Sequence, residues 1–100
     1  MFEVRRTGLF NQWFAKLRDD KAKARILVRI VRLSRGNLGD VKPVGGGVSE
    51  LRIDYGPGYR VYFTRIGSLV VLLLVGGTKK TQPSDIERAQ SMTKEATNGS

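Results

Sequence analysis

Apolar residues recur with helical spacing in the first third of the chain and predict two helices. Within residues 9–18 they stand at i, i+3, i+4 and i+7 and form one stripe: Phe10, Trp13, Phe14 and Leu17. A second helix is expected from Asp19 or Asp20 to Ser34 or Arg35, because acidic residues favour a helix start. Its buried line is Ala22, Ile26, Ile30 and Leu33. Both stripes are interpreted as core, Trp13 included.

Strict alternation of apolar and polar residues predicts short strands over 1–6, 48–54 and 59–63. The link Tyr55-Gly-Pro-Gly58 supplies turn residues, so the last two of these strands should form a hairpin. Residues 69–75 are apolar throughout, which is typical of an interior strand covered on both faces.

The remaining segments are a loop and a last helix. Residues 37–47 contain Pro43 and three consecutive glycines and are expected to form a loop. A last helix is expected from about Ser84 to Ala96. The elements predict a single α+β domain over residues 1–96, with a frayed tail over 97–100. Its order is β-α-α-β-β-β-α, with the helices packed on one face of a small, mainly antiparallel sheet.

Composition and charge narrow the class of function. The chain of 100 residues has no cysteine and no histidine, which excludes a disulfide framework, a cysteine zinc site and a Ser-His-Asp triad. No apolar run approaches the roughly twenty residues of a membrane span, so a cytoplasmic protein is expected. Lys and Arg number 18 against 9 Asp and Glu, a formal net charge of +9, which favours a polyanionic partner such as nucleic acid or the ribosome. The alternative interpretation is that the positive net charge serves only to keep the protein soluble.

A basic row follows the buried line of the second helix about 100° around its axis. The row consists of Lys21, Arg25, Arg29 and Arg32. It could lie along an RNA backbone, or it could receive an acidic segment of a partner protein. An ordinary solvated helix face is the third interpretation.

The predicted hairpin carries charged residues on the face opposite its core residues. Arg52 and Asp54 share that face on the first arm, and Arg60 and Tyr62 share it on the second. Cross-strand ion pairs between Arg60 and the acidic residues Glu50 or Asp54 are one interpretation of this pattern, and they would contribute little to stability at the surface.

The whole chain to about Ala96 resembles the RelE/ParE superfamily of bacterial toxins from type II toxin-antitoxin modules, and most closely its HigB-like, "addiction module killer" branch. The resemblance rests on residues 50–54, 58–63, the apolar strand that ends in Gly76-Gly77, Lys79-Lys80, and residues 84–87. RelE-like members cut messenger RNA in the ribosomal decoding site, whereas ParE-like members poison DNA gyrase without being nucleases. The resemblance implies a cognate antitoxin, with which the chain would form a hetero-oligomer.

Carried over to this sequence, the resemblance makes Arg60 the arginine at the scissile phosphate. Lys79 or Lys80 would supply a second cation, and Arg52 matches a basic residue of the adjacent strand. The chain departs from the RelE pattern at Glu50, where a lysine is expected, and at Asp85-Ile86, where no tyrosine is present.

Residue chemistry supports the same candidates. Guanidinium groups suit bidentate phosphate contact, a lysine can act as a point charge or a base, and Tyr62 or Glu50 could move a proton. The candidate catalytic residues are therefore Arg60, Lys79, Lys80, Arg52, Glu50 and Tyr62, and the candidate RNA- or ribosome-binding residues are Lys21, Arg25, Arg29 and Arg32. No metal and no cofactor are expected.

Three hypotheses follow. The first is a ribosome-dependent mRNA endoribonuclease, or mRNA interferase, that inhibits translation and is held inactive by its antitoxin. The second is a ParE-like gyrase inhibitor, for which Glu50 and the missing tyrosine leave room. The third is a non-catalytic module that binds RNA or the ribosome with steep salt dependence.

Overall fold

A single five-stranded sheet organises the chain. The computed structural model describes the backbone of residues 1–98 and the side chains of residues 1–95. Within this part the strand order is β1-β5-β4-β3-β2, with β1 parallel to β5 and all other neighbours antiparallel. The strands are β1 (Glu3–Arg6), β2 (Val41–Gly45), β3 (Val48–Ile53), β4 (Tyr59–Ile66) and β5 (Val70–Thr78). The predicted α+β class is confirmed.

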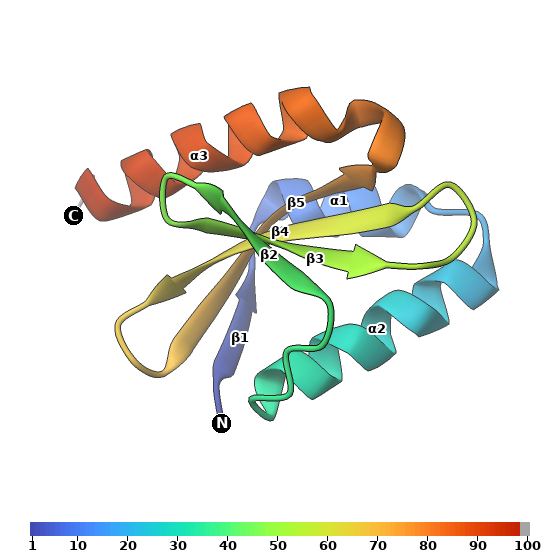
Figure 1. The fold of residues 1–100 in the computed structure, drawn as a ribbon, viewed down its shortest axis with the longest axis horizontal. Helices are drawn as coiled ribbons and strands as arrows, with labels where there is room; N and C mark the ends of the chain where they lie inside the picture. Colours follow the sequence, from blue (N-terminus) through green and yellow to red (C-terminus); the bar gives the residue numbers. More distant parts are fainter. Residues whose placement is uncertain (99–100) are drawn as a thin grey trace.

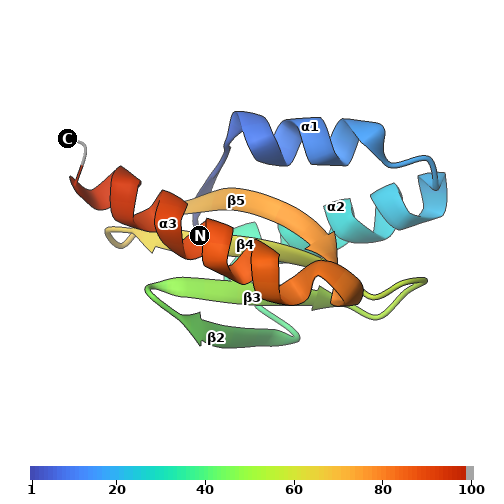
Figure 2. The ribbon, with the colours of Figure 1, turned by 90° about the horizontal axis from the view of Figure 1, so that it is seen from above.

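Helices cover both faces of this sheet. In Figure 1, α3 (Gln82–Asn98) lies above the sheet and α2 (Asp20–Ser34) below it. Figure 2 shows α1 (Gly8–Lys16) at the top of the picture, beyond β5, and α1 shares one core cluster with α2. The prediction that all helices pack on one face is therefore wrong.

The reason is that the strands present apolar side chains in both directions. One core cluster joins α1 and α2 to one face of the sheet through Phe10, Ile26, Leu33, Leu51, Val61 and Leu73. The other joins α3 to the opposite face through Ala89, Val48, Tyr62, Leu74 and Val75. An apolar run such as that of β5 has to be covered on both faces.

The two N-terminal helices begin where the sequence predicts. The Thr7 hydroxyl accepts a hydrogen bond from the Phe10 amide at 3.0 Å and caps α1. The Asp19 carboxylate accepts from the amides of Lys21 and Ala22 and caps α2. Trp13 packs on Gly76 of β5 so closely that a Cβ there would lie 2.2 Å from its ring. Its predicted role as a packing residue is confirmed.

The predicted loop over residues 37–47 is partly wrong, because β2 forms within it. Pro43 of β2 pairs with Ser49 of β3, and within residues 1–98 β2 has no neighbour on its other side. Proline is tolerated in an edge strand because its missing N–H can fall on the side without a partner. The prediction thus missed one strand. Its last residue, Gly45, makes the turn into β3 together with Gly46 and Gly47, and all three have positive φ angles.

The C-terminal region differs from the prediction in its start. The turn η1 (Lys79–Thr81) follows β5 directly, and α3 then begins at Gln82. The backbone is helical through Asn98. The predicted frayed tail over residues 97–100 lies partly outside the described residues and stays a prediction. None of the helices within residues 1–98 has the length and apolarity needed to cross a bilayer.

Candidate functional site

Two arginines lie side by side on the face of the sheet that α3 covers. Arg52 of β3 is the direct cross-strand partner of Arg60 of β4, and Arg60 is in turn paired with Gly77 of β5. Like charges directly opposite each other on neighbouring strands are destabilising unless something compensates them. A third charged group has to lie close to both guanidinium groups.

Glu50 is that group. Its side chain is completely buried, and its Oε1 atom accepts a hydrogen bond from Arg52 Nε at 2.9 Å and lies 3.7 Å from Arg60 Nε. Its Oε2 atom accepts from the Tyr62 hydroxyl at 3.0 Å and from Gln82 Nε2 at 2.6 Å. The ion network offered above as an alternative is present, but it is centred on a buried carboxylate, and Asp54 forms none of its recorded ion pairs.

This environment fixes the charge state of the network. Burial opposes ionisation of Glu50, but hydrogen bonds from Arg52, Gln82 and Tyr62 outweigh it and lower the pKa of this carboxyl below its ordinary value. Burial, followed by the hydrogen bond to Glu50, raises the pKa of the Tyr62 hydroxyl well above its ordinary value. At neutral pH Glu50 is therefore ionised and Tyr62 is protonated.

Arg60 is held tightly but is not saturated with partners. Its side chain is 12% exposed, and its Nη1 atom donates to the Tyr59 carbonyl oxygen at 3.1 Å. Its Nε atom is buried and, within the described residues, has no hydrogen-bond partner. Arg52 is more open, with 33% of its side chain exposed. A buried donor without an acceptor is unusual in a folded protein, and the nearest recorded counter-charge of this atom is the Glu50 carboxylate.

Lys79 lies beside this pair because of a close approach at Gly58. The Lys79 amide donates to the Gly58 carbonyl oxygen at 2.8 Å. A Cβ added at Gly58 would lie 3.3 Å from both Arg60 Nη1 and Lys79 Cβ. The side chain of Lys79 is exposed, as is that of Lys80, the next residue of η1.

Sequence reasoning missed Gln82 and the cluster around Gly77. A Cβ at Gly77 would lie 1.9 Å from Asp85 Oδ2, and this carboxylate accepts a hydrogen bond from the Thr81 hydroxyl at 2.5 Å. Gly77, the cross-strand partner of Arg60, therefore gives the start of α3 room to approach β5. The only signal in the sequence is Pro83, which is typical of the first helical turn and places Gln82 at the helix start.

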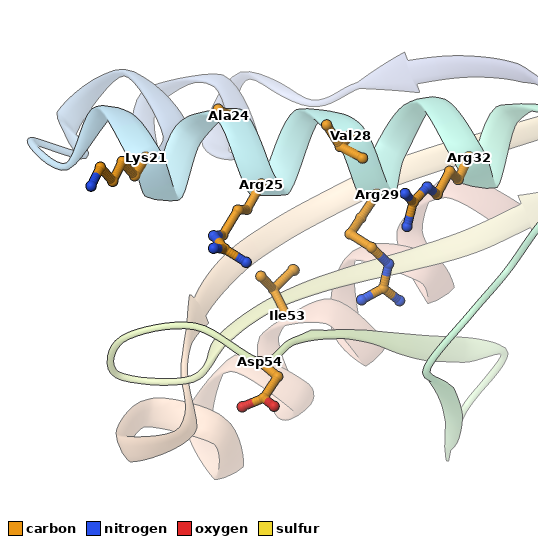
Figure 3. Close-up of a pocket in the computed structure, with 8 residues that line it drawn as sticks. All are labelled: Lys21, Ala24, Arg25, Val28, Arg29, Arg32, Ile53 and Asp54. Carbon is orange, nitrogen blue, oxygen red and sulfur yellow. The ribbon is translucent and has the colours of Figure 1, made fainter.

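The basic row of α2 lies on the opposite side of the sheet from this cluster. Figure 3 shows Arg25 and Arg29 reaching from the helix toward the end of β3. Arg29 donates to the carbonyl oxygens of Arg52, Leu38 and Asp40 and thus anchors the chain around it. Burial, opposed by the nearby Asp40 carboxylate, lowers the pKa of Arg29 from its ordinary value.

The other members of the row are more available. Arg25 lies over the ring of Tyr55, with its Cζ atom 4.7 Å from the ring centroid. Lys21 and Arg32 are exposed, and no ion pair involves either of them within the described residues. The four residues of the predicted basic row thus lie along one helix. Arg29, however, uses its donors on backbone carbonyl oxygens of the protein itself.

The cluster can bind a phosphate and stabilise added negative charge on it. Two guanidinium groups lie side by side there with the Cβ of Lys79 next to them, and their recorded ion pairs are both with the Glu50 carboxylate. Among the described residues, no group of three or more acidic, cysteine or histidine side chains could hold a metal ion.

Comparison with known proteins identifies the family. An uncharacterized protein of Haemophilus influenzae is 46% identical over 93 residues, which cover 93% of this chain and 94% of that protein. Residues 12–94 match the family described as phage-derived, Gp49-like proteins. This match includes every candidate site residue on α2, the hairpin and η1. The chain therefore belongs to the Gp49-like family, which is associated with toxin-antitoxin modules.

Proposed function

We propose that this protein is the toxin of a type II toxin-antitoxin module, of the HigB-like branch of the RelE/ParE superfamily, and that it cuts messenger RNA on the ribosome. The observation that carries the proposal is the pair Arg52 and Arg60, held side by side by the buried Glu50 with Lys79 at its edge. Family membership supports a toxin and an antitoxin partner. The cluster supports phosphate chemistry.

Cleavage requires three events at one phosphate. The 2′-hydroxyl loses its proton and its oxygen attacks the phosphorus, the bond to the 5′ oxygen breaks, and that oxygen gains a proton. The products are a 2′,3′-cyclic phosphate and a 5′-hydroxyl end. The transition state carries extra negative charge on the phosphate oxygens, which fixed cations stabilise.

Each cation of the cluster has a role in this scheme. Arg60 and Arg52, whose side chains are 12% and 33% exposed, hold the phosphate in line for attack. Lys79 supplies a point charge beside them or accepts the first proton. Lys80 is the second candidate for that role, because it is exposed on the same turn.

Glu50 and Tyr62 act by supporting the arginines. Both side chains are completely buried, and the Tyr62 hydroxyl donates a hydrogen bond to the Glu50 carboxylate. The pKa of Glu50 is lowered and that of Tyr62 is raised, which opposes proton exchange by either group near neutral pH. We therefore assign them the positioning of Arg52 and Arg60 in place of proton transfer.

The ribosome supplies what the cluster lacks. With no histidine in the chain, proton transfer is slow, and the reaction depends on a substrate already held in a reactive geometry. The exposed cations of α2, Lys21, Arg25 and Arg32, add affinity for an RNA backbone that is independent of sequence. No metal or cofactor takes part in this scheme, and its setting is the cytoplasm.

Burial of Glu50 and Tyr62 also favours a second candidate function. Of the catalytic candidates it leaves Lys79 and Lys80 for proton transfer, and a protein that binds without catalysis needs no such group. A ParE-like gyrase inhibitor is therefore the alternative, and a non-catalytic module that binds RNA or the ribosome is a further one.

The test is a reconstituted translation reaction in which mRNA ends are mapped by primer extension. The proposal predicts cuts that require ribosomes and disappear with Arg60→Ala. Arg65→Ala removes an exposed arginine from the other end of the same strand and should leave the cuts in place. Intact mRNA with the wild-type protein would overturn the nuclease, and loss of gyrase supercoiling would then establish the alternative.

A further inference from the structure

The side of α2 that faces away from the sheet is apolar. Leu27, Val28 and Val31 are 38%, 47% and 47% exposed, and Ala24 is exposed with them. These four residues have the spacing i, i+3, i+4 and i+7, so they form one continuous stripe, here called the outer stripe. The buried line of α2 lies on the other side of the helix, and the protein's own core therefore does not explain the outer stripe.

Cations border the outer stripe. Lys21, Arg25 and Arg32 run along the helix between the outer stripe and the sheet, and no ion pair involves them within the described residues. They line a groove of about 560 Å³ together with Val28 and the end of β3. Figure 3 shows Ala24 and Val28 on the side of the helix away from Ile53 and Asp54, while Arg25 points toward them. The surface thus offers an apolar strip with positive charge along one edge.

We propose that this surface docks an acidic, amphipathic helix of another protein, which packs apolar side chains on the outer stripe and places carboxylates along Lys21, Arg25 and Arg32. Proteins commonly bind a partner's amphipathic helix in such a groove, and the apolar residues that make the contact recur at helical spacing along the bound helix. This inference deepens the proposed function, since the occupant would be the antitoxin. Occupation would also cover the cations that we assign to RNA binding.

Charge decides between the possible occupants. An RNA backbone would use the cations but would gain nothing from exposed leucine and valine side chains. A second copy of the chain would bring the same basic row and a net charge of +9, so that the two copies would repel. An acidic helix satisfies the apolar stripe and the basic edge together.

The test uses the full chain and a synthetic helical peptide with leucine along one side and glutamate along the flank, and binding is measured by fluorescence anisotropy. The variant Leu27→Gln/Val28→Thr/Val31→Thr changes only exposed side chains. The matched control, Ile66→Thr/Leu69→Gln, removes two exposed apolar residues around the turn between β4 and β5. Thermal unfolding checks that both variants fold.

The proposal predicts that the glutamate peptide binds and that the triple variant weakens it at least about tenfold, or ~1.4 kcal/mol. The control variant should bind as the wild type does, and a peptide with lysine in place of glutamate should bind at least about tenfold more weakly. Hydrogen exchange should show protection over residues 20–34. Equal affinity for wild type and triple variant, or protection confined to another element, would overturn the proposal.

Two further outcomes would overturn the proposal by identifying a different occupant of the outer stripe. A wild-type dimer in sedimentation that the triple variant abolishes would identify a second copy. Binding to phosphatidylserine vesicles that depends on the outer stripe, without binding of the peptide, would identify an anionic membrane surface. The peptide measurement contains no ribosome and no RNA, so it can fail while mRNA cleavage is observed, or succeed while cleavage is absent.

Discussion

Replacing Glu50 with glutamine should destabilise the protein strongly, because one buried carboxylate serves four neighbours. It accepts hydrogen bonds from Arg52, Tyr62 and Gln82 at 2.6–3.0 Å and lies 3.7 Å from Arg60 Nε. Glutamine has the same size but only one acceptor oxygen. Its amide nitrogen is a donor and would face one of the donors that now bind the carboxylate. The Arg60 guanidinium would also lose its buried counter-charge.

The size of the effect follows from these contacts. Removing one partner of a buried charge pair costs about 3–5 kcal/mol. We expect the lower value, about 3 kcal/mol, because Arg52 is partly exposed and water can replace part of its interaction. For a domain of this length each kcal/mol lowers the melting temperature by about 4–8 °C, so the variant Glu50→Gln should melt roughly 12–24 °C below the wild type.

The pH dependence supplies a second measurement. The folded-state pKa of Glu50 is lowered, so its stabilising contribution is fully present above the unfolded-state value of about 4.3 and is lost as the pH falls through the folded-state pKa. The difference in unfolding free energy between wild type and Glu50→Gln should therefore be constant near pH 7. It should shrink below about pH 4.

The control is Glu3→Gln, which removes a carboxylate from an exposed pair. Glu3 and Arg5 both remain largely in water, and exposed pairs contribute about 0–1 kcal/mol. Chemical denaturation at pH 7 measures both variants against the wild type. A loss of less than about 1 kcal/mol for Glu50→Gln, similar to that for Glu3→Gln, would refute the view that Glu50 organises the cluster.

Three further predictions concern the cluster and the basic row. Gly77→Ala should lower stability by about 1–3 kcal/mol in chemical denaturation, since its Cβ would overlap a carboxylate, whereas Gly8→Ala, with open space around its Cβ, should have little effect. Tyr62→Phe should cost about 1.5 kcal/mol yet keep ribosome-dependent cleavage within about tenfold, and a complete loss of cleavage in a folded variant would restore its proton-transfer role. Lys21→Ala and Arg32→Ala should each reduce the salt slope of RNA binding by about 1, and an unchanged slope would remove them from the interface.

The hairpin could be predicted from sequence because its information is local. Alternation placed Leu51 and Ile53 in the core and Arg52 on the opposite face, and the structure confirms this. The strand β2 was missed because Pro43 argues against a strand until its edge position is known. The sequence did not predict that α3 covers the opposite face of the sheet, because this depends on the direction in which the chain turns after β5.

The candidate site was only partly predictable for a similar reason. Residue types and the hairpin indicated Arg52 and Arg60 as neighbours, but burial is a property of the whole fold. Nothing local shows that α3 encloses Glu50 and delivers Gln82 to it. The residues of the outer stripe of α2, by contrast, stand at helical spacing in the sequence. They indicate a docking surface only once the structure shows that they are exposed.

The most direct test of the central claim is the single-turnover rate of mRNA cleavage on programmed ribosomes, compared between wild type, Arg60→Ala and Arg65→Ala. Removing one preorganised charge at the reacting phosphate should slow cleavage about 10²–10³-fold in Arg60→Ala, and Arg65→Ala should retain the wild-type rate. The fragments should end in a 2′,3′-cyclic phosphate and a 5′-hydroxyl. Equal rates for wild type and folded Arg60→Ala, or no cleavage by the wild type, would contradict the assignment of this cluster as a nuclease site.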